Sequence, residues 1–180
     1  MEFEKDLVQQ LQSGKNPDSA FQQLVNLYKE RLYWHIRNMV KNHDDADDVL
    51  QNTFIKVFRN IKKFKGDSKL FSWMYRIATN EAITFLNSKA RKMNISNEEL
   101  QEKLIDNLES DVYFEGEKIQ LQLQKAISTL PEKQRQVFNM RYFQEMKYQE
   151  IAEILEVTEG SLKSNYHHAA KKVEAFLKQG

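Results

Sequence analysis

The chain has 180 residues, with 27 Lys and Arg against 26 Asp and Glu, a formal net charge of +1 and no cysteine. Without cysteine it has neither disulfides nor thiolate metal ligands, which fits a reducing compartment. No apolar run approaches the roughly 18 residues that a membrane helix needs, and the acidic N-terminus is unlike a signal peptide, so we expect a soluble, cytoplasmic protein.

Composition and charge order predict the domain organisation. Five glycines and two prolines beside abundant Leu, Lys, Glu and Gln favour an all-α fold. Basic residues outnumber acidic ones by 16 to 11 over residues 1–95 and by 10 to 7 over 118–180, but residues 96–117 carry one base and eight acids. We therefore expect two small helical domains, 1–92 and 118–180, joined by a flexible acidic linker, 93–117.

Three helices are predicted in the first domain. Apolar residues at helical spacing indicate a helix over roughly residues 18–41. A second helix begins on the carboxylate cluster of residues 44–48, where acids suit the positive end of the helix dipole, and runs to Ile61. A basic loop over 62–69 then leads into a third helix, from Leu70 to about Ser88.

The carboxylate cluster has two interpretations. Asp44, Asp45, Asp47 and Asp48 could ligate Mg²⁺ for phosphoryl chemistry, which needs convergent oxygen ligands. Helix capping with an exposed contact surface is favoured, because no second cluster of similar density completes a metal site. The sequence also lacks a glycine-rich phosphate loop and an activated nucleophile. We predict no metal, no cofactor, no small-molecule substrate and no enzymatic activity.

Aromatic and basic residues gather around the 62–69 loop and the helix that follows it. Together they could stack on an unpaired base, read its edge and contact phosphates. Phe71 and Trp73 are expected in the core, since large aromatics at helical spacing normally pack inward. Exposure is expected instead for Phe64, Lys65, Lys69 and Asn80.

The segment 148–173 predicts a helix-turn-helix. Its first helix carries the apolar stripe Ile151, Ala152, Ile154 and Leu155. Val157 is expected to plug the turn, and Thr158 to cap a second helix that begins near Glu159. Buried positions on that helix are Leu162, Tyr166, Ala169 and Val173, with Ser161, Ser164, His167, His168 and Lys171 facing outward. Such a helix can enter the DNA major groove, although a solvated helical hairpin in an ordinary bundle would have the same spacing.

Several motifs, in order, resemble the extracytoplasmic-function sigma factors. The first domain of that family is matched by DDADDVLQNTFIKVF at 44–58, FKGDS at 64–68 and FSWMYRIATN at 71–80. Its second domain is matched by LPEKQRQVF at 130–138, YQEIA at 148–152 and GSLKS at 160–164. The resemblance covers about residues 18–90 and 118–178.

The resemblance implies a bacterial transcription-initiation subunit with three contact surfaces. The implied minus-10 DNA contacts are Phe64, Lys65, Ser68, Lys69, Arg76 and Asn80. The implied minus-35 contacts are Ser161, Lys163, Ser164, His167, His168 and Lys171. Asp48, Gln51 and Phe54 would dock on the clamp coiled coil of core RNA polymerase, and the second domain would sit on the polymerase flap. An inhibitory anti-sigma factor is a further implied partner, and the acidic linker would thread the RNA exit path.

The recognition helix departs from the family pattern. Relatives commonly have arginines where Asn165, His168 and Ala170 stand here, so phosphate contacts should be fewer and the salt dependence shallower. Two other classes also remain. A stand-alone helix-turn-helix regulator would bind duplex DNA without polymerase, and a metal-dependent nuclease would use the Asp44 to Asp48 cluster.

Overall fold

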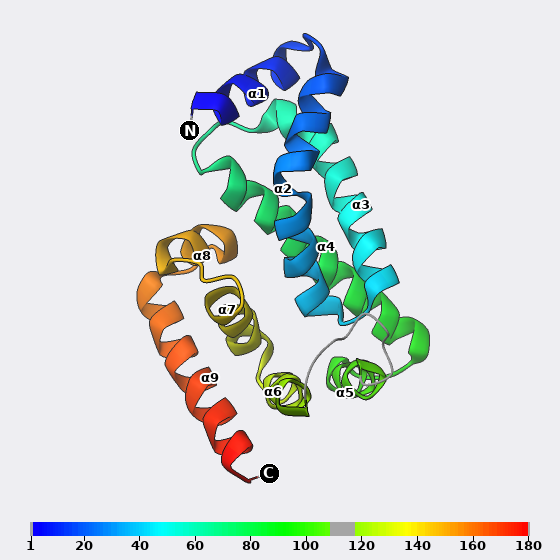
Figure 1. Cartoon of the computed structure of the whole chain (residues 1–180), viewed down its shortest axis with the longest axis vertical. Coiled ribbons are helices and arrows are strands. Elements are labelled where there is room, and N and C mark those ends of the chain that lie inside the picture. Colours follow the sequence, from blue (N-terminus) through cyan, green and yellow to red (C-terminus); the bar gives the residue numbers. More distant parts are fainter. Residues whose placement is uncertain (1, 109–117, 180) are drawn as a thin grey trace.

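The computed structural model describes residues 2–108 and 118–179, and every regular element in these ranges is helical (Figure 1). The first part of the chain forms α1 (Glu2–Ser13), α2 (Pro17–Val40), α3 (His43–Asn60), a 3₁₀ turn (Ile61–Lys63) and α4 (Leu70–Met93). It continues with α5 (Asn97–Leu108), α6 (Lys118–Ser128), α7 (Glu132–Tyr142), α8 (Tyr148–Leu155) and α9 (Glu159–Gln179). The predicted all-α fold is confirmed.

Helices α2, α3 and α4 form the first bundle, and α1 crosses one end of it (Figure 1). Pro17 opens α2, at a position where a missing backbone N–H costs nothing. Asn42 caps α3 by accepting a 2.9 Å hydrogen bond from the backbone N–H of Asp45, so the carboxylate cluster occupies the first turns as expected. Fully buried Leu24, Leu32 and other apolar residues fill the core between these helices.

Helices α8 and α9 form the predicted helix-turn-helix, packed on α7. The hydroxyl of Thr158 accepts a 3.3 Å hydrogen bond from the backbone N–H of Ser161, which confirms the predicted cap. Leu162 and Ala169 are buried on the inner face of α9. One detail of the prediction is wrong: Val157 is 40% exposed in the turn and plugs nothing. The preceding Glu156 turns the chain instead, in a left-handed conformation with φ of 56°.

The two bundles share one hydrophobic core. Met140 of α7, Met146 before α8 and Ile151 of α8 belong to the same buried cluster as the core residues of α2, α3 and α4. A second, smaller cluster lies between α6, α7 and α9. The domains expected at 1–92 and 118–180 therefore pack against each other through α4 and α8 (Figure 1).

Half of the expected acidic linker is a helix. Residues 97–108 form α5, which begins with a reciprocal cap. The backbone N–H of Ser96 donates to the Glu99 carboxylate at 2.8 Å, and the backbone N–H of Glu99 donates to the Ser96 hydroxyl at 3.1 Å. Leu100, Leu104 and Leu108 are buried against neighbouring helices, at the spacing of an amphipathic helix. The acidic residues of α5 lie on its exposed face. Their high density is why the sequence predicted a flexible linker here and not an amphipathic helix. The rest of the expected linker, residues 109–117, lies outside the described residues.

Within the described ranges, no helix combines the length and apolar character required to cross a membrane.

Candidate nucleic-acid interface

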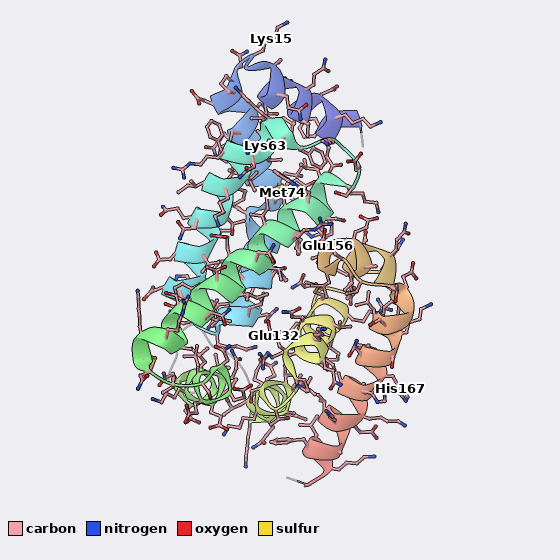
Figure 2. All side chains as sticks on the ribbon, turned by 180° about the vertical axis from the view of Figure 1, so that it is seen from behind. Lys15, Lys63, Met74, Glu132, Glu156 and His167 are labelled. Carbon is pink, nitrogen blue, oxygen red and sulfur yellow. The ribbon has the colours of Figure 1, made fainter. Side chains whose placement is uncertain are left out.

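The outer face of α9 is open to solvent. All six residues that the sequence assigned to minus-35 contacts are exposed on it: Ser161, Lys163, Ser164, His167, His168 and Lys171. Figure 2 places His167 on the side of α9 that points away from the first bundle. The Lys163 ammonium lies 5.8 Å from the centre of the Tyr148 ring, which ties the two helices together. This face presents hydroxyls, imidazoles and two ammonium groups without a carboxylate among them.

The loop between the 3₁₀ turn and α4 carries most of the predicted minus-10 residues. Lys65 and Lys69 are exposed, as is Asn80 further along α4, in agreement with expectation. Phe64 was expected to be exposed but is half-buried, with its ring centre 5.2 Å from that of Trp73. Buried Phe71 and half-buried Trp73 pack inward as predicted.

Helix α1 forms a wall beside this loop that the sequence reasoning missed. A cavity of about 490 Å³ lies between α1 and the loop, and Phe64, Lys65, Ser68 and Lys69 line one side of it. From α1, the Gln12 side-chain amide donates hydrogen bonds to the backbone carbonyls of Ile61, at 3.0 Å, and Phe64, at 2.7 Å. These two bonds hold the start of the loop in place.

Arg76 occupies a different environment from the other predicted minus-10 residues. Its guanidinium donates to the Glu156 carboxylate at 2.7 Å and to the backbone carbonyl of Glu153, both beside the turn after α8. One turn earlier in α4, the buried Ser72 hydroxyl donates to the Glu153 carboxylate at 2.7 Å. Lys69 lies 3.5 Å from Glu150. Part of the predicted DNA face is therefore in contact with the second bundle.

The outer side of α3 holds an apolar groove. Asp48 and Gln51 are exposed, as the predicted polymerase-docking residues should be. Phe54 is only 8% exposed, however, and its ring packs edge-on against Phe21. It forms the floor of a groove of about 580 Å³, whose rim includes the 44% exposed Phe58. The accessible apolar surface thus comes from neighbours of Phe54, which the sequence did not single out.

Two of the carboxylates at the start of α3 have partners within the protein. Asp45 forms an ion pair with Lys89 of α4, and the His43 imidazole lies 3.5 Å from the Asp47 carboxylate. Across residues 2–108 and 118–179, no three His, Asp or Glu side chains are grouped so that they could hold a metal ion. These contacts support the capping and packing interpretation of the cluster.

Two titratable groups are buried where the bundles meet. Burial lowers the pKa of His35 to about 4. Its ring nitrogens contact the Thr79 hydroxyl at 2.8 Å and the Gln144 amide at 2.9 Å. Burial, with the nearby guanidinium groups of Arg135 and Arg37, lowers the pKa of Lys41 to about 7.

Comparison with known proteins identifies the two bundles. The family model for Sigma-70 region 2 matches residues 24–92, and that for Sigma-70 region 4 matches residues 120–173. The extracytoplasmic-function (ECF) sigma factor SigW of Bacillus subtilis is 31% identical over 176 residues, covering 93% of this chain and 92% of SigW. The ECF sigma-E factor of Haemophilus influenzae is 29% identical, with 93% and 92% covered.

The chain belongs to the ECF family of RNA polymerase sigma factors. As a sigma factor, it binds core RNA polymerase, directs it to promoters and assists promoter melting. Region 2 of this sigma factor spans α2, α3 and α4, and region 4 spans α6 to α9. Helices α1 and α5 lie outside both family models.

Solved structures share the fold of this sigma factor. CnrH, determined in complex with the cytosolic domain of CnrY, superposes with a TM-score of 0.72 at 21% identity, with 98% of each chain covered. RpoE of Bartonella quintana, in complex with the anti-sigma factor NepR, gives a TM-score of 0.66 at 20% identity, with 88% of this chain and 96% of RpoE covered.

Proposed function

We propose that this sigma factor divides promoter recognition between its two bundles. Region 2 engages the minus-10 element through the Phe64 to Lys69 loop and Asn80, and the exposed face of α9 enters the minus-35 major groove. The observation that carries this division is the exposure of all six predicted α9 residues on one side of the recognition helix. Promoter recognition and melting need only binding contacts, so we propose no enzymatic activity for this chain.

Melting follows from binding energy. Unstacking a base costs a few kcal/mol, and stacking on an aromatic side chain returns roughly 1–3 kcal/mol per base. The 490 Å³ cavity beside the loop offers the lysines Lys65 and Lys69 for phosphates and the half-buried ring of Phe64 for a base. An unpaired nucleotide held there stabilises the open strands without ATP.

For polymerase docking, we propose that the α3 surface contacts the clamp coiled coil of core RNA polymerase and that region 4 rests on the flap. Asp48 and Gln51 supply polar contacts, while exposed Ile55 and Phe58 supply apolar area next to them. An anti-sigma factor is the further partner, since RpoE, which shares this fold, was solved in complex with the anti-sigma factor NepR. The site of action is then the cytoplasm, where the polymerase works.

Reconstitution tests the function. Purified chain is added to sigma-free bacterial core polymerase on a genomic DNA template from a bacterium that encodes it, and transcript start sites are mapped by sequencing. We expect discrete start sites that share a pair of upstream elements. Transcripts that start at random positions, or a DNA mobility shift by the chain alone that equals the shift with polymerase, would contradict a sigma function.

The division of labour has its own test. Lys163→Ala and Ser164→Ala remove exposed groups of α9 without touching its buried face. Loss of a base or phosphate contact costs roughly 1–3 kcal/mol, so transcription from a mapped promoter should fall about tenfold or more while polymerase affinity is unchanged. Glu174→Gln, on the same helix but distant from these positions in sequence, serves as control. An equal loss of polymerase binding would refute the assignment.

A further inference from the structure

A small cavity lies where α2, α4, α5 and α7 meet. This junction cavity has a volume of about 40 Å³. Met39 of α2 and Ile83 and Leu86 of α4 form its apolar wall, whereas α5 and α7 contribute most of its polar lining. Glu132, labelled in Figure 2, belongs to the α7 part. The residues assigned to promoter and polymerase contacts lie elsewhere, so the proposed function does not account for this cavity.

Two buried amide oxygens in the cavity lining have no donor. Gln101 of α5 is 4% exposed and Asn139 of α7 is 3% exposed. Gln101 Oε1 and Asn139 Oδ1 accept no hydrogen bond from the described residues. Each such oxygen costs free energy unless a donor reaches it. Because both residues line the same cavity, a single small guest with two donors could satisfy both oxygens and bridge the two helices.

The charges in the lining select a neutral guest. Arg135 of α7 lines the cavity, and its guanidinium donates to the backbone carbonyls of Ser128 and Leu130 at 3.4 and 3.3 Å. The positive guanidinium disfavours a cation. An anion is disfavoured by the two amide oxygens and by the exposed Glu132 carboxylate, which also belongs to the lining. The remaining class is an uncharged molecule that both donates and accepts hydrogen bonds.

Water fits both the chemistry and the size of the junction cavity. A buried water needs at least roughly 10–15 Å³ of such space and typically makes about three hydrogen bonds. The cavity volume of about 40 Å³ therefore holds about one to three waters. A water can donate to Gln101 and Asn139 and accept from Arg135. Rotating either amide by 180° would present its NH2 group, and water could then accept from it.

We propose that the junction cavity is a hydration site in which a small cluster of ordered waters bridges Gln101 of α5 to Asn139 and Arg135 of α7. The site goes beyond the proposed function and does not depend on it. It explains how two buried amides from different helices are stabilised at one place. The waters are then part of the structure and hold α5, which lies outside both family models, against region 4.

The apolar attachment of α5 makes this bridge matter. Leu100 and Leu104 form one small cluster with Ala90 of α4. A second small cluster joins the end of α5 to Leu121 of α6. Both clusters are separate from the main core, so they stabilise α5 less than a shared core would. The water bridge adds polar contacts to α7, which neither apolar cluster includes.

Cross-relaxation between water and amide protons in the full chain tests whether waters occupy the cavity. The side-chain NH2 groups of Gln101 and Asn139 should show water cross-peaks of opposite sign in NOESY and ROESY spectra, the signature of a long-lived bound water. The described lining residues include no Ser, Thr or Tyr hydroxyl that could relay such a signal. The exposed NH2 group of Gln10 is the control and should lack the signature. Its absence at both Gln101 and Asn139 would overturn the proposal.

Gln101→Met and Asn139→Leu test the bridge, because each replaces an amide by an apolar group of similar size. Either substitution should remove the water signature at the remaining amide. In a double-mutant cycle, their combined effect on the unfolding equilibrium constant should depart from additivity by about threefold or more, as for residues that share a partner. The control cycle pairs Asn139→Leu with Gln10→Met and should be additive. Additivity in both cycles, with the water signature retained in each single variant, would refute the bridge.

Discussion

At the scale of single residues, the chain places long side chains where glycine is usually found. Lys41, Glu145 and Glu156 have φ between 51° and 61°, the left-handed region that costs a residue with a Cβ roughly 1–2 kcal/mol. Asn16 and Asn94 share this conformation, which asparagine tolerates better. Glu156, with its left-handed backbone, also forms the ion pair with Arg76.

Glu145 offers a stability test, because it is exposed and lies between α7 and α8 with φ of 51°. Glu145→Gly should raise the free energy of unfolding by about 0.5–1 kcal/mol, since relief of the left-handed strain exceeds the extra flexibility of the unfolded chain. Urea denaturation measures the change. Glu174→Gly, inside helix α9, should instead lower stability by about 1 kcal/mol. A loss of stability in both variants would contradict the strain assigned to Glu145.

At the scale of elements, α1 illustrates how a segment outside both family models can shape the site. Its Leu7 and Leu11 are buried on the first bundle, which presents Gln12 to the loop. The two backbone carbonyls that Gln12 binds, those of Ile61 and Phe64, lie at the entry to the 64–69 loop. We expect α1 to hold the 64–69 loop in position and not to contact promoter bases itself.

Gln12→Ala removes both hydrogen bonds and leaves the apolar face of α1 unchanged. Because each bond contributes about 1 kcal/mol, loop order should fall and open-complex formation at a mapped promoter should drop by about fivefold or more. Affinity for core polymerase should be unaffected. Permanganate footprinting of unpaired thymines measures opening, with Gln10→Ala on the exposed side of α1 as control. Equal opening in the two variants would exclude the positioning role.

The helices with strong periodicity were predictable, while contacts between distant segments were not. The start of α9 at Glu159 and the run of α2 from Pro17 follow from caps and apolar spacing. Helix α5 was not predicted because the linker was assigned from its excess of acidic residues. A count of charges does not detect that Leu100 and Leu104 lie on one face. The burial of Phe54 and the pairing of Arg76 with Glu156 depend on which helices pack together. The spacing of residues within one helix does not predict such contacts.

At the scale of the whole molecule, buried polar groups link the two bundles. His35 of α2 contacts Thr79 of α4 and Gln144 of the second bundle. The Lys41 ammonium, at the end of α2, donates to the side-chain amide oxygen of Gln124 in α6 at 2.5 Å. Thr79 donates its own proton to the backbone carbonyl of Tyr75, so it accepts from His35 Nε2–H, and His35 Nδ1 accepts from Gln144. These bonds require the neutral imidazole.

Acid should therefore lower the free energy of unfolding of the chain with its two bundles packed together. Burial holds the pKa of His35 at about 4 in the folded chain, against 6.5 in the unfolded chain, so the folded state binds fewer protons between these values. The His35 contribution is fully present above pH 6.5 and is lost as pH falls toward 4, with an upper limit of about 3 kcal/mol. The neighbouring Tyr75 ring, at 4.9 Å, supplies no compensating charge in this range.

Urea denaturation at a series of pH values from 7 down to 4 isolates this term by comparison between variants. His35→Gln keeps amide groups near Thr79 and Gln144 but cannot titrate, so its stability should fall less steeply with acid than that of the parent chain. His167→Gln, at an exposed position on α9, should retain the parent slope. Carboxylates titrate in all three proteins and cancel in the comparison. If the His35→Gln slope matches the parent slope, the imidazole does not couple the two bundles to pH.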